Sequence, residues 1–210
     1  MERDPDFESE PGVHRPHASA ALVVSVQSVI WTVLSSTVAI ALGVSSGTAV
    51  LVAFGAVGFV DAVGSVALAY HFNHGLRHDE LSDRIEALAH RIVLVGLLLV
   101  GSASVAGGIV RLAIGQRSDV PTAAVVLAAV SFAVLVVLAR RKRSIARAVG
   151  SAALVSDAHL SGVGASQAAV ALAGTALAQL FGWHSADAIA TAVVGCVAVM
   201  LAIVTMRGRG

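Results

Sequence analysis

The sequence has a single cysteine and few charged residues. Cys196 has no partner for an intrachain disulfide, and one thiol rules out a cysteine-based zinc site. Charged residues make up 13% of the chain, about half the share of roughly 25% in soluble globular domains, whereas 57% of residues are hydrophobic. No basic stripe with interleaved aromatic residues indicates nucleic-acid binding. No P-loop and no His-Glu-x-x-His motif occurs, and we expect no enzyme activity.

Six long apolar segments occupy most of the chain. Residues 1–18 are acidic, contain prolines, lack periodicity and are predicted as a disordered cytoplasmic tail. Each segment reaches the roughly 20 residues that a membrane-spanning helix needs, and none alternates with the period of two of a barrel strand. The predicted spans are 19–42, 47–70, 87–114, 120–139, 150–181 and 185–206. The sequence therefore predicts an all-α membrane protein, with a six-helix transmembrane domain at 19–206 and a short cytoplasmic tail at 207–210.

The distribution of basic residues predicts the orientation in the membrane. An even number of spans places both termini on one side, and cytoplasmic segments carry an excess of Lys and Arg. With both termini cytoplasmic, only Arg111 and Arg117 of the fourteen basic residues lie outside. The Arg-Arg-Lys-Arg run at 140–143 is interpreted as a cytoplasmic topology anchor. We expect an integral protein of the plasma membrane with both termini in the cytoplasm.

Asp61 is the first candidate functional residue. It is the only charged residue from Ser19 to Tyr70 and lies near the middle of the second span. A carboxylate there costs at least roughly 2.5–3.5 kcal/mol, so such residues are usually functional. Asp157 of the fifth span lies at about the same depth, on the order of 12–15 Å from the cytoplasmic end. Two carboxylates facing one cavity would repel each other, and a cation between them would resolve the repulsion.

His159 supplies the nitrogen ligand that zinc and other transition metals favour. Residues two apart point about 200° from each other on a helix, so Asp157 and His159 face one point only if the helix is irregular. Ser65 and Ser161 each lie four residues after one of the aspartates and are candidate supporting ligands. The alternative is a structural hydrogen-bonded contact between two helices.

The segment between the second and third spans is rich in histidine. His71, His74 and His78 follow the spacing i, i+3, i+7, and Glu86 and His90 the spacing i, i+4. On a helix each set shares one face, which could collect metal ions at a cytoplasmic mouth. The alternative interpretation is a solvated, charged loop followed by the start of a helix.

These features resemble the cation diffusion facilitator family. The resemblance covers about 19–206 and depends on the order of six spans and the elements SGTAVLVAFGAVGFVD, RIEAL, SAALVSDAH and GWHSADAIA. It implies a homodimer and a metal site between spans two and five. Asp61 matches the second acidic position of that site, whereas Val57 occupies the first. Asp157 and His159 are one residue closer than the family's pair, and Gly164 or Ala165 replaces a later aspartate. The sequence ends after the sixth span, as in a short branch without the C-terminal cytoplasmic domain.

The resulting prediction is a divalent-cation transporter, with zinc first, that exports its substrate in exchange for protons by alternating access. Asp61, Asp157 and His159 would bind the metal, which is the substrate, and no cofactor is expected. The partners are membrane lipid, divalent ions, protons and a second copy of the chain, with no nucleic acid. Two alternatives remain open. One is a non-transporting membrane protein with a degenerate metal site that acts by binding a partner. The other is a transporter of a different ion or a small solute.

Overall fold

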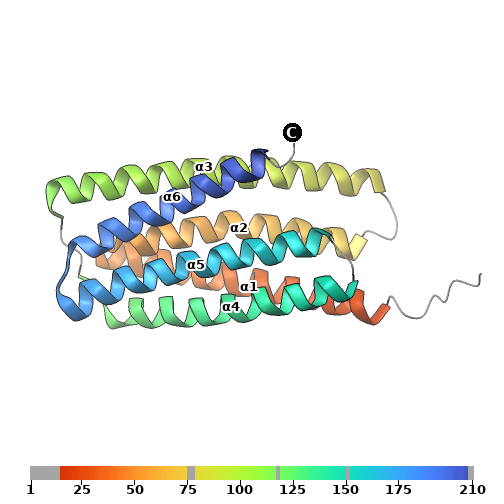
Figure 1. The fold of residues 1–210 in the computed structure, drawn as a ribbon, viewed down its shortest axis with the longest axis horizontal. Coiled ribbons are helices and arrows are strands. Elements are labelled where there is room, and N and C mark those ends of the chain that lie inside the picture. The colour runs from red at the N-terminus through yellow and green to blue at the C-terminus, as the bar shows by residue number, and fades with distance from the viewer. Residues whose placement is uncertain (1–14, 75–78, 117–118, 150–151, 208–210) are drawn as a thin grey trace, which may run out of the picture.

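The computed structural model describes residues 15–74, 79–116, 119–149 and 152–207. This part of the chain forms six long α-helices that run up and down in an elongated bundle (Figure 1). The helices are α1 (Arg15–Ser46), α2 (Ala49–His74), α3 (Asp79–Ile114), α4 (Thr122–Val149), α5 (Ala152–Phe181) and α6 (Ser185–Arg207). All six are long and apolar enough to cross a membrane. The predicted all-α bundle of six potential spans is therefore confirmed.

The outer surface of the bundle is apolar along its length. Large hydrophobic side chains such as Ile30, Leu99 and Met200 are more than half exposed. In water such a surface would be costly, because apolar area contributes free energy roughly in proportion to its exposure. The exposed apolar surface and the helix lengths together are those of an integral membrane protein.

Helix α2 lies at the centre and contacts α1, α3, α5 and α6. The pairs α1 with α2, α3 with α6 and α4 with α5 pack most extensively. Glycines allow close approaches between helices: a Cβ atom on Gly195 of α6 would lie 2.6 Å from the Gly101 carbonyl oxygen of α3. Membrane helices commonly pack through such small residues because lipid provides no hydrophobic drive between them.

The connection between α1 and α2 is a tight turn. Gly47 has a φ of 68°, a left-handed conformation that residues with a Cβ rarely adopt, and the Thr48 amide donates to the Gly43 carbonyl at 2.9 Å. Residues 43–47 match the Gly-x-Ser-x-Gly pattern of hydrolases, but they end a helix instead of joining a strand to a helix. The Ser45 hydroxyl donates to the Leu42 carbonyl at 3.0 Å, which is a helix-end contact.

The two ends of the bundle differ in the helix connections that they carry. The α1–α2 end carries the α1–α2, α3–α4 and α5–α6 connections, and the α4–α5 end carries the start of α1, the end of α6 and the other two connections (Figure 1). Helix α4 continues to Val149, ten residues past its predicted end, because its Arg-Arg-Lys-Arg run is helical. Helix α3 begins at Asp79, eight residues before its predicted start.

Candidate functional site

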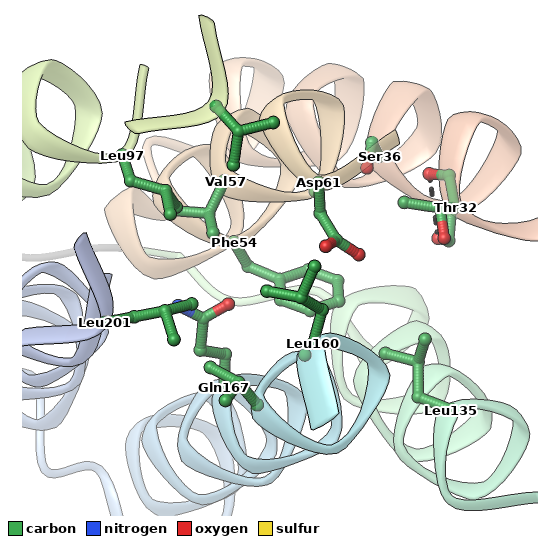
Figure 2. A pocket seen from close by; sticks show the side chains of 15 residues that line it. Thr32, Ser36, Phe54, Val57, Asp61, Leu97, Leu135, Leu160, Gln167 and Leu201 are labelled. Carbon is green, nitrogen blue, oxygen red and sulfur yellow. Dashed lines mark hydrogen bonds between the residues drawn. The ribbon is translucent and has the colours of Figure 1, made fainter. Parts of the chain in front are cut away.

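A small cavity lies inside the bundle beside Asp61 (Figure 2). Its volume is ≈ 30 Å³, more than the roughly 10–15 Å³ that one buried water molecule needs. Residues from all six helices line the cavity. The described lining residues are Thr32, Ser35, Ser36, Phe54, Val57, Gly58, Asp61, Val93, Leu97, Leu135, Leu160, Val163, Gly164, Gln167 and Leu201. A cavity of this size has room for a water molecule or a dehydrated ion.

The polar atoms of the cavity come from three helices. Asp61 projects from α2 toward α5, and Gln167 projects from α5 toward α2 (Figure 2). Gln167 is 3% exposed, and its Nε2 has no hydrogen-bond partner in the described part of the chain. Thr32 and Ser36 add buried hydroxyls from α1. A buried amide without a partner costs roughly 1–3 kcal/mol, so a site with this composition favours a polar or charged occupant.

Val57 and Gly164, two residues noted in the sequence comparison above, also line the cavity. Val57 lies one helical turn before Asp61 on α2 and is 3% exposed, and Gly164 faces the same space from α5. Neither side chain offers a donor atom to a ligand. Carboxylate, amide and hydroxyl oxygens are therefore the donors that the described lining residues provide. Such oxygens suit hard cations, whereas imidazole and thiolate suit softer transition metals.

His159 is not part of this cavity. Helix α5 is continuous from Ala152 to Phe181, so no irregularity brings residues 157 and 159 to one face. The His159 side chain is exposed and absent from the cavity lining. His159 therefore does not share the cavity with Asp61 in this structure, and its role as a metal ligand stays a prediction. The side chain of Asp157 lies outside the described residues, so its pairing with Asp61 stays a prediction.

The two serines predicted as supporting ligands are both buried at 2% exposure. Ser65 lies one turn beyond Asp61 on α2, toward the α4–α5 end, and does not line the cavity. The Ser161 hydroxyl accepts a hydrogen bond from Lys142 Nζ at 2.8 Å. Ser161 is therefore beside a fixed ammonium group, which is an unfavourable place for a metal ligand.

Residues 140–143, interpreted above as a cytoplasmic topology anchor, differ in exposure, and the orientation itself stays a prediction. Arg140, Arg141 and Arg143 are exposed, but Lys142 is 0% exposed. Its ammonium donates to the Ser28 hydroxyl of α1 and the Ser161 hydroxyl of α5, both at 2.8 Å. Lys142 therefore links three helices inside the bundle.

Another buried charge lies at the α1–α2 end. Asp187, in the first turn of α6, is 1% exposed and accepts hydrogen bonds from the Ala49 and Val50 amides at 3.1 and 3.0 Å. These amides belong to the first turn of α2, where backbone donors lack partners within the helix. Arg111 of α3 lies 3.7 Å from Asp187 and donates to the Gly47 carbonyl at 2.6 Å. Asp187 is a structural cap that joins three helices.

The structure describes much of the backbone of the histidine-rich segment but not the side chains of its candidate ligands. Helix α2 extends to His74 and α3 begins at Asp79, so most of this segment is helical backbone. The side chains of His71, His74, His78, Glu86 and His90 lie outside the described residues. Their predicted role at a cytoplasmic mouth therefore remains a prediction.

Within the side chains that the structure describes, no three His, Cys, Asp or Glu residues lie close enough together to form a metal site. No protein-family model and no curated protein sequence matches this chain. The fold and the composition define a helical membrane bundle with an internal cavity whose mostly apolar wall carries a few polar side chains, among them Asp61 and Gln167.

Proposed function

We propose that this protein transports a divalent metal cation across the membrane and exchanges it for protons. The observation that carries the proposal is the Asp61 carboxylate, which lines a cavity of ≈ 30 Å³ together with the buried Gln167 amide. A carboxylate in the low-dielectric centre of a membrane bundle is costly unless a cation or a proton accompanies it. A site of this size and charge fits a dehydrated cation.

Proton exchange follows from the chemistry of the carboxylate. Asp61 must be deprotonated to bind a metal ion, so metal binding releases protons and reprotonation releases the metal. A proton gradient can therefore drive export from the cytoplasm. Rocking of helices around a fixed central site would expose the cavity to each side in turn. By the family resemblance, zinc is the first substrate to test and Asp157 the second carboxylate.

A flux assay in proteoliposomes tests this proposal. The panel contains Zn²⁺, Mn²⁺, Co²⁺, Cd²⁺ and Mg²⁺, each with and without an imposed pH gradient. We expect gradient-dependent flux of at least one divalent ion. Asp61→Ala and Asp157→Ala should each abolish this flux, and Asp61→Asn should also abolish the accompanying proton movement.

The matched control is Asp119→Asn, which removes an exposed carboxylate between α3 and α4. This variant should retain full flux. Thermal melts of the apo proteins separate a metal site from a structural pair of carboxyls. Loss of one like charge should leave the apo protein unchanged or stabilised, whereas loss of a hydrogen-bonded partner should cost roughly 1–3 kcal/mol. Undiminished flux in Asp61→Ala, or strong destabilisation of both apo variants without a zinc-dependent shift in wild type, would overturn the proposal.

One observation favours a second candidate, the transport of a monovalent cation. Among the described lining residues Asp61 is the one carboxylate, and Val57 and Gly164 provide no further charge. A single carboxylate balances one positive charge without a second anion. Na⁺ and K⁺ therefore belong in the same flux panel, and Asp61-dependent flux of either, without divalent flux, would support this candidate. A protein that moves none of these ions would instead fit the non-transporting alternative.

A further inference from the structure

Lys142 carries a buried positive charge that has no role in the transport cycle proposed above. It is 0% exposed, although it stands between Arg141 and Arg143, whose side chains are exposed. A lysine near the end of a membrane helix normally extends its ammonium outward to the interface. Here the ammonium points inward and donates to Ser28 of α1 and Ser161 of α5, both at 2.8 Å. The inward position thus depends on contacts made by two other helices.

The positions of Ser28 on α1, Ser161 on α5 and Lys142 on α4 all place this ammonium on one side of the Asp61 cavity. Ser28 lies four residues before Thr32 of the cavity on α1, and Ser161 lies three residues before Gly164 on α5. At 1.5 Å per residue, each anchor is about 4.5–6 Å from the cavity along its helix. Lys142 lies seven residues beyond Leu135 on α4, in the same direction. The ammonium therefore lies between the cavity and the α4–α5 end of the bundle.

The polar face of α1 continues past this point. Ser25, one turn before Ser28, is 0% exposed and its Oγ has no hydrogen-bond partner in the described residues. Ser25, Ser28 and Thr32 follow the spacing i, i+3, i+7 and share one side of the helix. A row of buried hydroxyls therefore leads from the α4–α5 end to the cavity and passes Lys142.

We propose that Lys142 is the gate of the Asp61 cavity at the α4–α5 end, and that its ammonium must leave Ser28 and Ser161 before a cation passes on that side. The side chain blocks the row of hydroxyls by its volume, and its positive charge repels an approaching cation. Lys142 is a positioning residue that controls access, and it is distinct from the ligands of the cavity. This inference depends on the proposed function, because a gate requires a transported ion.

A labelling experiment without metal tests the gate. In a Cys196→Ser background, Thr32→Cys places a thiol in the cavity wall, and proteoliposomes are treated with aminoethyl methanethiosulfonate from the α4–α5 side. Adding Lys142→Ala should speed the labelling of the thiol by on the order of tenfold, which corresponds to about 1.4 kcal/mol of opening free energy. Arg141→Ala, which removes the exposed neighbouring charge, is the control and should leave the rate unchanged.

A second variant keeps the test decisive if Lys142→Ala does not fold. Ser28→Ala combined with Ser161→Ala retains the lysine but removes the two serine hydroxyls to which its ammonium donates, and it should also speed labelling. Equal labelling rates in wild-type, Lys142→Ala and double-serine backgrounds would overturn the inference. Because the assay contains no transported ion, this failure is distinguishable from failure of the proposed function, which would appear as absent flux while the gate still responds to the variants.

Discussion

The Asp187 carboxylate of α6 accepts a hydrogen bond from the backbone amide of Val50 in α2 at 3.0 Å, across 137 residues of sequence. A second bond from the neighbouring amide completes the cap. An aspartate usually caps its own helix, whereas this one satisfies the first turn of another helix. The interaction fixes the start of α2, the helix that carries Asp61.

Asp187→Ala should destabilise the protein. The substitution leaves two backbone amides at the start of α2 without an acceptor, and Arg111 loses its neighbouring carboxylate. Loss of a capping group costs roughly 0.5–2 kcal/mol, and buried unsatisfied donors add to this cost. Thermal melts in detergent measure the effect, with the exposed carboxylate variant Asp119→Ala as the control. Equal melting temperatures for both variants would contradict the role of Asp187 as a cap.

Gly195→Ala should also destabilise the bundle, by separating α3 from α6. The added Cβ would meet the Gly101 carbonyl oxygen at 2.6 Å, and backbone atoms have to move to relieve the contact. Overpacking of this kind typically costs about 1–3 kcal/mol. Gly107→Ala on α3 is the matched control, because nothing lies within 4 Å of its added Cβ. A lower melting temperature for Gly107→Ala than for Gly195→Ala would show that the α3–α6 packing is described wrongly.

Gln167→Leu should separate function from stability. Leucine removes the buried amide whose Nε2 has no described partner, so the free energy of unfolding should stay constant or rise. The same change removes an oxygen donor from the cavity, so flux of the transported ion should fall by on the order of tenfold or more if the amide is a ligand. Gln116→Leu changes an exposed glutamine and serves as the control. Normal flux in Gln167→Leu would remove this residue from the site.

Residues 140–143 should face the cytoplasm. A cysteine at Arg141, in a Cys196→Ser background, should resist impermeant thiol reagents added to intact cells, whereas a cysteine at Gln116 should react. Both positions are exposed on the protein and lie at opposite ends of the bundle. This orientation is expected because basic residues are in excess at the α4–α5 end, and cytoplasmic segments carry an excess of Lys and Arg. Efficient labelling at position 141 together with protection at 116 would reverse the orientation and the direction of the proposed export.

Replacement of His71, His74 and His78 by alanine should weaken apparent metal affinity only modestly. Histidines on one helical face at the mouth would raise the local metal concentration without forming the central site, so the loss should stay within about tenfold. The dependence of flux on metal concentration measures this change. Complete loss of flux in the folded triple variant would place the main metal site at the mouth of the bundle.

The six spans were predictable from the sequence because length and apolarity alone decide whether a helix can cross a membrane. The helix ends were less predictable: α3 and α4 continue into charged segments, where arginine and lysine are good helix formers. Depth in the membrane singled out Asp61, and Asp61 does line the cavity. The grouping of His159 with Asp157 required an irregular helix, and the continuous α5 leaves His159 exposed and outside the cavity lining.

The buried positions of Gln167, Lys142 and Asp187 were not predicted from the sequence, and each omission has a physical reason. Gln167 is uncharged, and polar uncharged residues in apolar helices are often only packing contacts. Lys142 was grouped with the basic residues on either side of it, which are exposed. It nevertheless shares a face of α4 with the buried Leu135, seven residues before it, and Ala146, four residues after it. Asp187 stands near a predicted helix start, and its partner amides could not be inferred without the arrangement of α2 and α6.

The cap formed by Asp187 also affects the order of events during synthesis. The amides at the start of α2 are translated 137 and 138 residues before the carboxylate that satisfies them. At about 5–20 residues per second, this delay lasts roughly 7–28 seconds. During that interval the helix that carries Asp61 lacks its cap, and a nascent chain that stops before α6 never acquires it. Assembly of the cavity therefore waits until α6 has been synthesised.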